Sequence, residues 1–301
     1  MDMGMIGLGR MGANMAERLV RGGHRVVGFD LQPAAREAAA ASGIEPAASL
    51  AGLVARLPAP RVLWMMVPAG AAVEATLAEL VPMLAAGDTL VDGGNTHYPE
   101  STRRAGSLQP HGLHYVDCGT SGGIWGLEQG YCLMLGGEVE VVSHLAPLLR
   151  TLAPAPDRGW ARVGPAGAGH FSKMVHNGIE YGMMQAYAEG FAIMQRKQAF
   201  ELDLPQLAEL WRHGSVVRSW LLDLSAAALA ANPSMQGIAP YVEDSGEGRW
   251  TVAEAIELGV PAPVITLSLL QRLRSRDAAS FTDRLLAAMR NQFGGHRIRR
   301  E

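Results

Sequence analysis

The stretch MGMIGLGRMG, residues 3–12, decides the fold of the first half of this 301-residue chain. Its opening residues read as a short buried strand, and a GxGxxG pattern follows and opens a helical segment. The first glycine permits a tight turn, the second lets the backbone approach a pyrophosphate, and the third lets helix and strand pack closely. The start of a helix also favours a bound anion. The stretch therefore predicts a dinucleotide site at Gly7, Leu8, Gly9, Arg10, Met11 and Gly12.

A carboxylate at the end of the next predicted strand supports this site. Asp30 lies 18 residues after Gly12, where an acid accepts the ribose 2′-hydroxyl of NAD and repels the 2′-phosphate of NADP. Asp30 could instead be a turn residue ahead of Pro33. NAD is favoured, and NADP stays an alternative because Arg10 could approach a 2′-phosphate.

Apolar runs alternate with helix-like segments throughout the first half of the chain. The runs predicted as strands are Met3–Gly7, Arg25–Asp30, Arg61–Val67, Thr89–Asp92, Leu113–Cys118 and Tyr131–Gly136. The segments predicted as helices are Met11–Gly22, Pro33–Ser42, Ala71–Leu84, Pro99–Gln109 and Val139–Leu149. This alternation is typical of βαβ units and predicts a mostly parallel, doubly wound sheet, the Rossmann type of α/β domain.

The pattern changes after residue 163, where the stretch GPAGAG is followed by helical periodicity alone. The predicted helices are Phe171–Lys197, Leu204–His213, Val216–Ala231, Thr251–Leu258, Pro261–Ser275 and Phe281–Arg290. We therefore expect an α/β Rossmann domain over residues 1–163 and an all-α domain over residues 164–301. A short basic tail follows Gly294.

The composition limits the classes of partner. The formal net charge is −3 and no sustained basic run is present, which argues against nucleic acid. No apolar run approaches the roughly 20 residues that span a bilayer, and the first residues lack the pattern of a signal peptide. Charged residues make up 18% of the chain, below the average of about 25%, so another subunit is expected to cover part of the surface.

The lack of a spanning run and of a signal-peptide pattern predicts a cytoplasmic protein, and the cysteine and histidine usage fits that compartment and predicts no metal centre. The two cysteines, Cys118 and Cys132, lie in apolar strand contexts and are expected in the core, with no disulfide between them. The nine histidines show no HxxxH grouping and the cysteines no CxxC grouping, so no metal ligand set is expected.

Three loops follow predicted strands at the edge where open α/β sheets bind ligands. They contain Val67-Pro68-Ala69, Asp92-Gly93-Gly94-Asn95 and Ser121-Gly122-Gly123. The first could line the adenosine or nicotinamide of the dinucleotide. Each could instead be an ordinary turn, because these residue types are common in turns. Their shared place at strand ends favours a binding role.

A polar stripe follows the long helix predicted after residue 170. Lys173, His176, Asn177 and Glu180 are spaced i, i+3, i+4 and i+7, which places them on one helix face. A solvated surface stripe is the plain alternative. The rest of the circumference is apolar or glycine, so we expect a helix buried on most sides, with the stripe lining a cavity.

The stripe suits hydride transfer from a secondary alcohol, which needs a base for the hydroxyl proton. A partly desolvated lysine can be neutral near pH 7, whereas arginine, with a pKa above about 12, stays charged. The chain has 26 basic residues, and Lys173 and Lys197 are its two lysines. Codon bias toward arginine explains why arginines outnumber lysines. It does not explain why position 173 keeps a lysine, whereas a need for an amine that can lose its proton does. Glu180 could be a second acid–base group.

Six motifs are spread over nearly the whole chain. They are GLGRMG (7–12), DGGNT (92–96), SGG (121–123), the run from 167 to 181, GEGRWT (246–251) and RNQFGGH (290–296). Taken in order, they resemble the 6-phosphogluconate dehydrogenase family, in its short, NAD-type bacterial form. The resemblance implies oxidative decarboxylation of 6-phosphogluconate to ribulose 5-phosphate in the pentose phosphate pathway.

The resemblance also implies a role for each matching residue. Lys173 would take the 3-hydroxyl proton and then, protonated, neutralise the enolate oxygen that develops as CO2 leaves. Glu180 would protonate C1 of the enediol, and Tyr181 would reach the phosphate. The carboxylate and hydroxyls would be held by Asn95, which also contacts the cofactor, and by Ser121, Gly122, Gly123, His176 and Asn177.

In this family the C-terminal tail of one subunit completes the active site of its partner. Arg290 and His296 match the tail residues that contact the substrate phosphate, for which arginine is well suited. A solvated basic tail is the plain alternative. The resemblance thus implies a homo-oligomer, at least a dimer, built through a helical domain that also binds substrate.

The sequence departs from the family at the phosphate site. Ser245 and Glu247 stand where the long form has Lys and Thr, which removes one cation. The long form also has a second helical repeat that donates an arginine and that this chain does not contain. Arg218 has similar surroundings and could substitute, or could form a structural salt bridge.

Two other functions stay open. A β-hydroxyacid dehydrogenase, such as one acting on 3-hydroxyisobutyrate, shares the fold, the Ser-Gly-Gly loop and a lysine four residues before an asparagine. A non-catalytic NAD-binding sensor would not need Lys173 together with Glu180. The pair His176 and Glu180 and the basic tail favour the sugar phosphate.

Overall fold

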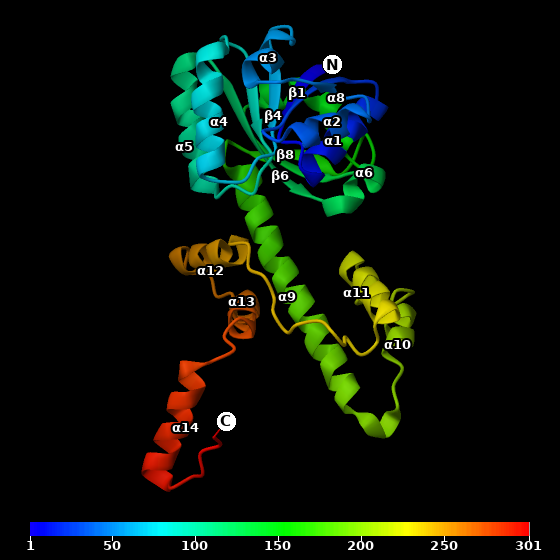
Figure 1. Ribbon diagram of the computed structural model, residues 1–301, viewed down its shortest axis with the longest axis vertical. Helices are drawn as coiled ribbons and strands as arrows, with labels where there is room; N and C mark the ends of the chain where they lie inside the picture. Colours follow the sequence, from blue (N-terminus) through cyan, green and yellow to red (C-terminus); the bar gives the residue numbers. More distant parts are fainter. Residues whose placement is uncertain (301) are drawn as a thin grey trace. The chain divides into compact units, whose positions relative to one another are not determined.

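The computed structural model describes residues 1–300 (Figure 1). The chain packs as two units, Met1–His176 and Asn177–Glu301, which are taken in turn below. The boundary predicted after residue 163 falls inside the last strand of the first unit, and the change of packing unit comes later, within a long helix. The roles assigned to the two predicted domains stay proposals.

An eight-stranded sheet forms the centre of the first unit. Its strands are β1 (Asp2–Ile6), β2 (Arg25–Phe29), β3 (Glu45–Pro46), β4 (Val62–Met65), β5 (Thr89–Asp92), β6 (His114–Ser121), β7 (Cys132–Gly136) and β8 (Trp160–Gly164). They lie in the order β3-β2-β1-β4-β5-β6-β7-β8, and every neighbouring pair is parallel except β6 with β7. This confirms the predicted mostly parallel, doubly wound sheet. The order reverses between β1 and β4, the place where such sheets bind ligands.

Helices cover both faces of the sheet (Figure 1). They are α1 (Arg10–Arg21), α2 (Pro33–Ala40), α3 (Leu50–Ala55), α4 (Ala71–Leu80), α5 (Tyr98–Leu108), α6 (Gly126–Gln129), α7 (Val139–His144) and α8 (Ala146–Leu152). Alternate residues of a strand face opposite sides. Val62 and Trp64 of β4 therefore join the core beneath α1 and α8, and Leu63 and Met65 join the core beneath α3 and α4. Burial on both sides explains why these strands read as continuous apolar runs.

Some elements differ from the sequence-based expectation. The short strand β3, helix α3 and strand β8 were not predicted, because β3 has two residues and the middle of β8 is exposed. The predicted helix Val139–Leu149 divides at Leu145, where Pro147 in the first turn of α8 prevents a continuous helix. Cys132 is exposed rather than in the core, because it lies at the start of β7, whereas Cys118 is buried.

The second unit is helical. It contains most of α9 (Ala168–Arg196) and all of α10 (Leu204–Trp211), α11 (Trp220–Ala231), α12 (Glu247–Glu257), α13 (Pro263–Ser275) and α14 (Phe281–Gly294). Within the described residues no strand follows β8, which confirms the predicted all-α second half. Helix α11 begins four residues later than predicted because Ser219 caps it, its hydroxyl accepting from the N–H of Leu222 at 3.1 Å.

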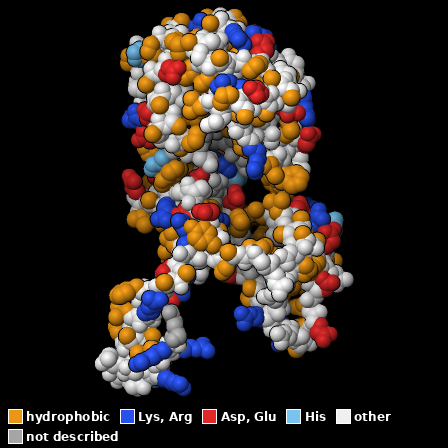
Figure 2. Space-filling model, viewed as in Figure 1, with side chains coloured by type: hydrophobic (Ala, Val, Ile, Leu, Met, Phe, Trp, Pro, Cys, Tyr) orange, Lys and Arg blue, Asp and Glu red, His pale blue; other side chains and the backbone are white. Residues whose placement is uncertain are grey.

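The apolar face of α9 is not buried within one chain, contrary to expectation. Ile179, Met183 and Met184 are 53%, 38% and 41% exposed. The compact core of this unit is small and comes from α9, α10 and α11. Large apolar side chains of α13 and α14 are also exposed: Val264, Leu267, Leu270, Phe281, Leu285, Leu286, Met289 and Phe293. Figure 2 shows apolar side chains on the surface of the helical unit. None of the described helices is long and apolar enough to cross a membrane.

Candidate active site

The glycine-rich turn between β1 and α1 has the shape that a pyrophosphate requires. Gly7 has φ +92°, and a Cβ atom placed there would lie 2.4 Å from the carbonyl oxygen of Met66. A Cβ at Gly12 would lie 2.0 Å from the carbonyl oxygen of Gly7. A Cβ at Gly9 would meet no atom within 4 Å, so open space lies beside the backbone where α1 begins. These residues fit a dinucleotide phosphate held by the helix N-terminus.

Asp30 is held beside this turn. Its two carboxylate oxygens accept hydrogen bonds from the N–H groups of Leu8, at 2.7 Å, and of Gln32, at 2.8 Å. Each oxygen keeps a further lone pair for a ribose hydroxyl. The carboxylate therefore suits the ribose of NAD, whereas Arg10 lies exposed at the first position of α1.

The turn after β4 and the loop after β5 meet at the same edge. A Cβ at Gly94 would lie 2.9 Å from the carbonyl oxygen of Val67, and one at Gly7 would lie 3.3 Å from a methyl group of Val67. The loops that carry Gly7, Val67 and Gly94 thus pack against one another. Pro68, Ala69 and Asn95 are exposed there.

The loop that carries Asn95 is pinned by Asp92, which ends β5. The Asp92 carboxylate accepts from the N–H of Gly94 at 3.2 Å and from the hydroxyl of Thr96 at 3.1 Å. These contacts lie on both sides of Asn95. The carboxylate therefore fixes the backbone from which the Asn95 amide projects.

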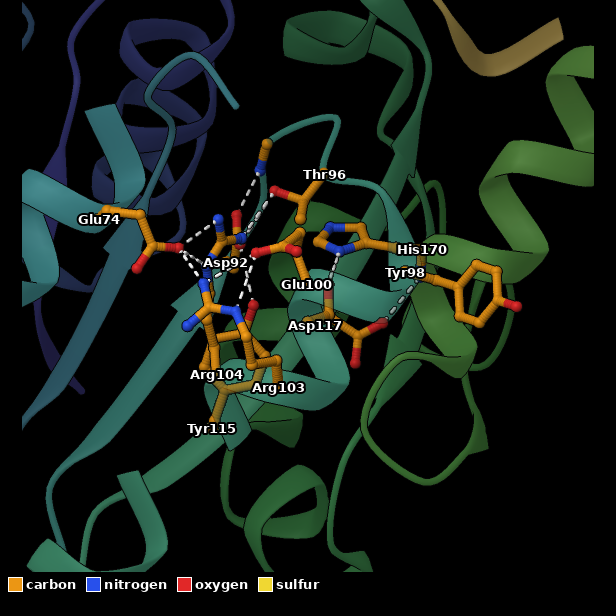
Figure 3. A network of polar contacts seen from close by, with 12 residues as sticks. Glu74, Asp92, Thr96, Tyr98, Glu100, Arg103, Arg104, Tyr115, Asp117 and His170 are labelled. Carbon is orange, nitrogen blue, oxygen red and sulfur yellow. Dashed lines mark hydrogen bonds and ion pairs between the residues drawn. The ribbon is translucent and has the colours of Figure 1, made fainter. Parts of the chain in front are cut away.

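A buried network surrounds Asp92 (Figure 3). Its carboxylate also accepts from the Tyr115 hydroxyl at 2.9 Å and from the Arg104 guanidinium at 3.2 Å, and Arg104 is 1% exposed. Arg104 bonds Glu74 as well, at 2.9 Å. Burial raises the pKa of Tyr115 well above its ordinary value, so the phenol stays a hydrogen-bond donor. Because every partner is engaged, the network holds the Asn95 loop rigidly.

Lys173, His176 and Ser121 come together beside the same sheet edge. The amine of Lys173 lies 3.4 Å from Nδ1 of His176, and Nε2 of that ring lies 3.4 Å from the Ser121 hydroxyl. Lys173 is 9% exposed. A Cβ at Gly119 would lie 2.4 Å from the Cβ of Lys173, so the backbone of β6 rests directly on the lysine stem. The amine is thus partly desolvated and beside two groups that can bind a hydroxyl or carboxylate.

The loop after Ser121 has a backbone that favours glycine. Gly122 has φ +139° and Gly123 has φ +52°, conformations that other residues rarely adopt. Further along α9, Asn177 and Glu180 occupy positions four and seven residues after Lys173, on the same helix face.

In the second unit, Tyr181 is stacked against a cation that the sequence analysis missed. The guanidinium carbon of Arg272 lies 3.5 Å from the centre of the Tyr181 ring. Tyr181 is 6% exposed, and its hydroxyl has no hydrogen-bond partner among the described residues. Arg272 donates to the carbonyl oxygen of Glu243 at 2.9 Å. No local pattern marks Arg272, since its pairing with Tyr181 depends on the packing of α13 against α9.

The other residues predicted for phosphate binding lie elsewhere in this unit. Arg218 is exposed in the turn before α11, and Arg290 is exposed on α14. The His296 ring packs edge-on against Phe293, with ring centres 6.1 Å apart. No hydrogen bond or ion pair of the described residues joins these three to Tyr181. At the start of α12 the Ser245 hydroxyl donates to the buried Glu247 carboxylate at 2.5 Å.

Among residues 1–300 there is no group of three or more His, Cys, Asp or Glu side chains that could hold a metal ion.

Two family models match the chain in order. Residues 2–162 match the NAD binding domain of 6-phosphogluconate dehydrogenase, and residues 169–282 match the 6-phosphogluconate dehydrogenase C-terminal domain. The NAD(+)-dependent, decarboxylating 6-phosphogluconate dehydrogenase of Haloferax volcanii is 46% identical over 100% of this chain and 99% of its own length. An enzyme of the same name from Bacillus subtilis is 35% identical over 91% of this chain and 61% of its own length.

Solved structures share the fold of this chain. The 6-phosphogluconate dehydrogenase of Plasmodium falciparum superposes with a TM-score of 0.85 at 26% identity, covering 100% of this chain and 66% of that protein. The 3-hydroxyisobutyrate dehydrogenase of Mycobacterium tuberculosis superposes with a TM-score of 0.74 at 23% identity, over 92% and 94% of the two chains, and shows the shared fold. The chain therefore belongs to the 6-phosphogluconate dehydrogenase family, whose NAD-binding and C-terminal domains it carries in that order.

Proposed function

We propose that this protein converts 6-phosphogluconate to ribulose 5-phosphate and CO2, with Lys173 as its base and Glu180 as its acid. The observation that carries the proposal is the buried amine of Lys173, 3.4 Å from His176, which in turn lies 3.4 Å from Ser121. A general base must lie within reach of the proton that it takes, and the neighbours of this amine can hold an alcohol beside it.

The residues act in an order that the chemistry dictates. NAD, held by the glycine-rich turn and Asp30, would supply the acceptor for the hydride that leaves C3 of the substrate. Neutral Lys173 takes the proton of the 3-hydroxyl, which leaves a 3-keto acid. The carboxylate then departs as CO2, and the protonated Lys173 neutralises the enolate oxygen that develops. Glu180 donates a proton to C1 of the enediol, which yields ribulose 5-phosphate.

The remaining residues of the edge hold the sugar acid. His176 and Ser121 lie next to Lys173, and the Asn95 loop is braced by Asp92. Amides, hydroxyls and backbone N–H groups are suitable partners for a carboxylate and several hydroxyls. We assign this role to Asn95, Ser121, Gly122, Gly123, His176 and Asn177.

The test is product formation from 6-phosphogluconate. We expect NADH to appear together with an equal amount of CO2, and NADPH formation from NADP to be slower because of Asp30. 3-Hydroxyisobutyrate is the control substrate for the rival β-hydroxyacid dehydrogenase function. NADH formation from that control alone, or NADH without CO2, would contradict the proposal, and a preference for NADP would contradict the role of Asp30.

We assign phosphate binding to Tyr181 and Arg272. Arg272 is the cation that lies on the Tyr181 ring, and the buried Tyr181 hydroxyl is available to donate to a phosphate oxygen. Arginine binds phosphate through two parallel hydrogen bonds. The phosphate site lacks one cation because Ser245 and Glu247 stand where the long form has Lys and Thr. We assign the compensating positive charge to Arg272 in place of Arg218.

The change Arg272→Met is expected to raise KM for 6-phosphogluconate by about tenfold or more while kcat changes little. It should also reduce the preference for 6-phosphogluconate over gluconate, which lacks the phosphate. The matched variant Arg218→Met, on an exposed side chain, should leave both values within about twofold of the original. A loss of phosphate preference in Arg218→Met rather than Arg272→Met would return the role to Arg218.

We further propose a homodimer in which the tail of one subunit reaches the site of the other. The exposed apolar side chains of α9, α13 and α14 support an additional partner surface, because isolated chains rarely expose so many. His296 and Arg290 are exposed, and no hydrogen bond or ion pair among residues 1–300 joins either of them to Tyr181. Both cysteines are free thiols, which supports the proposed cytoplasmic location.

A further inference from the structure

The first turn of α9 is fastened to strand β6 by one buried carboxylate. One oxygen of Asp117 accepts from the N–H of Gly167 at 2.6 Å, and the other accepts from the N–H of His170 at 2.7 Å. Asp117 has no exposed surface. Both N–H groups belong to the start of a helix, where backbone donors have no partner within the helix and a negative charge is favoured. Lys173 lies three residues after His170 on the same helix.

The strand and the helix turn are in direct backbone contact around this carboxylate. A Cβ at Gly169 would lie 2.4 Å from the carbonyl oxygen of Met134 and 2.6 Å from that of Asp117. A Cβ at Gly119 would lie 2.4 Å from the Cβ of Lys173 and 2.7 Å from the carbonyl oxygen of Gly169. The turn therefore has no room to move toward the sheet, and Asp117 prevents it from moving away.

A second contact holds the same turn against α5. The Nδ1 atom of His170 lies 2.7 Å from the Ser101 hydroxyl, and both residues are buried. Ser101 also bonds Tyr115, which donates to Asp92. Figure 3 shows His170, Tyr115 and Asp92 among the residues of this network. The turn that precedes Lys173 is thus connected through buried polar contacts to the aspartate that braces the Asn95 loop.

We propose that Asp117 is a positioning residue, which sets the place of the Lys173 amine by holding the first turn of α9 on β6. Asp117 and Ser121 lie on the same strand, so the carboxylate ties the base to the strand that carries its substrate-binding neighbour. Displacement of a base by about 1 Å can reduce a rate by about 10²-fold. This inference rests on the proposed role of Lys173.

The test compares two buried aspartates of the same sheet. Asp88, at the amino end of β5, is also fully buried and accepts from the N–H groups of Arg61 at 2.6 Å and Ala85 at 2.9 Å. Its contacts lie at the opposite strand end from Lys173. We expect Asp117→Asn to lower kcat per NAD-binding site by at least about tenfold, and Asp88→Asn to leave that value unchanged even where it lowers Tm.

The readouts separate positioning from loss of folded protein. NAD-binding sites are counted by titration, kcat is divided by that count, and the deuterium isotope effect is measured with 6-phosphogluconate labelled at C3. A misplaced base slows hydride transfer, so the isotope effect should rise in Asp117→Asn and not in Asp88→Asn. Normal kcat per site and an unchanged isotope effect in Asp117→Asn would overturn the inference.

A second variant keeps the test independent of the folding of the first. Gly119→Ala leaves Asp117 intact but pushes its methyl group against Lys173, so it should also lower kcat per NAD-binding site by about tenfold or more. Full kcat per site in Gly119→Ala would likewise overturn the inference. Lys173→Arg, measured in parallel, distinguishes the two proposals: an active Lys173→Arg enzyme contradicts the proposed function, whereas an inactive one beside a normal Asp117→Asn enzyme contradicts the positioning role alone.

Discussion

Replacing Lys173 with arginine is expected to lower kcat for 6-phosphogluconate by about 10² to 10⁴-fold, the range over which a general base contributes. Arginine keeps the positive charge and much of the length of lysine, so it could still neutralise the enolate oxygen. It cannot accept the proton of the 3-hydroxyl, because its pKa stays above about 12 in proteins. The loss should therefore appear in the hydride-transfer step.

The structure supplies reasons to expect NAD binding to survive this change. The glycine-rich turn and Asp30 are built by β1, α1 and β2, and the Asp30 carboxylate accepts from the N–H groups of Leu8 and Gln32. NAD affinity measured by titration should stay within about twofold of the original value. The chain offers one matched control, Lys197→Arg, because Lys197 is exposed after the end of α9, near the Phe200 ring. That variant should retain full kcat.

Near-normal turnover by Lys173→Arg would remove the lysine from the mechanism. The ratio of two lysines to 24 arginines would then reflect codon usage alone. A fall in kcat accompanied by an equal loss of NAD-binding sites would instead indicate misfolding, and the count of sites separates that outcome from a chemical defect.

The parts of the site that follow from local backbone rules could be predicted from the sequence. Gly7 and Gly12 are required by a positive φ and by a close backbone approach, and both requirements are visible as a spacing of glycines. The face shared by Lys173 and His176 follows from helical periodicity, and the structure places the two side chains 3.4 Å apart. The approach of Gly12 to Gly7 and that of Lys173 to His176 each join residues close together along the chain, and the positive φ of Gly7 is a local property of its own backbone.

The parts that depend on packing between distant segments could not be predicted. The pairing of Arg272 with Tyr181 joins α13 to α9, and no motif around Arg272 distinguishes it from the other arginines. Asp117 is a charged residue inside the apolar run YVDCG, and a buried charge needs a polar partner. The sequence therefore indicates that a partner exists, but not which segment supplies it. That partner is the start of α9, 50 residues further along the chain.

The exposed apolar face of α9 shows a different limit. Periodicity predicted that Ile179 and Met183 would be covered, and within one chain they are not. A hydrophobic pattern predicts that a surface is buried. It does not predict whether the same chain or a second copy covers that surface. The small core of α9, α10 and α11 leaves this face uncovered, so a second copy of the chain is the candidate to cover it. The C-terminal tail offers a test of that association.

Truncation after Gln292 is expected to abolish turnover of 6-phosphogluconate while sparing NAD binding. It removes residues 293–301, and with them His296 and the three arginines that follow it, but it keeps Arg290. In the folded chain His296 contacts Phe293 and Asn291 of its own segment, so its loss should not disturb the nucleotide-binding unit. The measurement is kcat per NAD-binding site, and full activity of the truncated protein would contradict the role proposed for His296.

A mixture of two inactive variants gives the sharper form of this prediction. If the tail completes the partner's site, a dimer of one truncated subunit and one Lys173→Arg subunit contains a site with an intact Lys173 and an intact tail. Random pairing after co-expression should place such sites at about a quarter of the total in a two-fold symmetric dimer. Activity should therefore return to about a quarter of the original, although each variant alone is inactive. If the tail serves its own subunit, every site lacks either the lysine or the tail, and the mixture stays inactive. Recovery would establish both the dimer and the crossing of the tail, because neither alone generates a complete site.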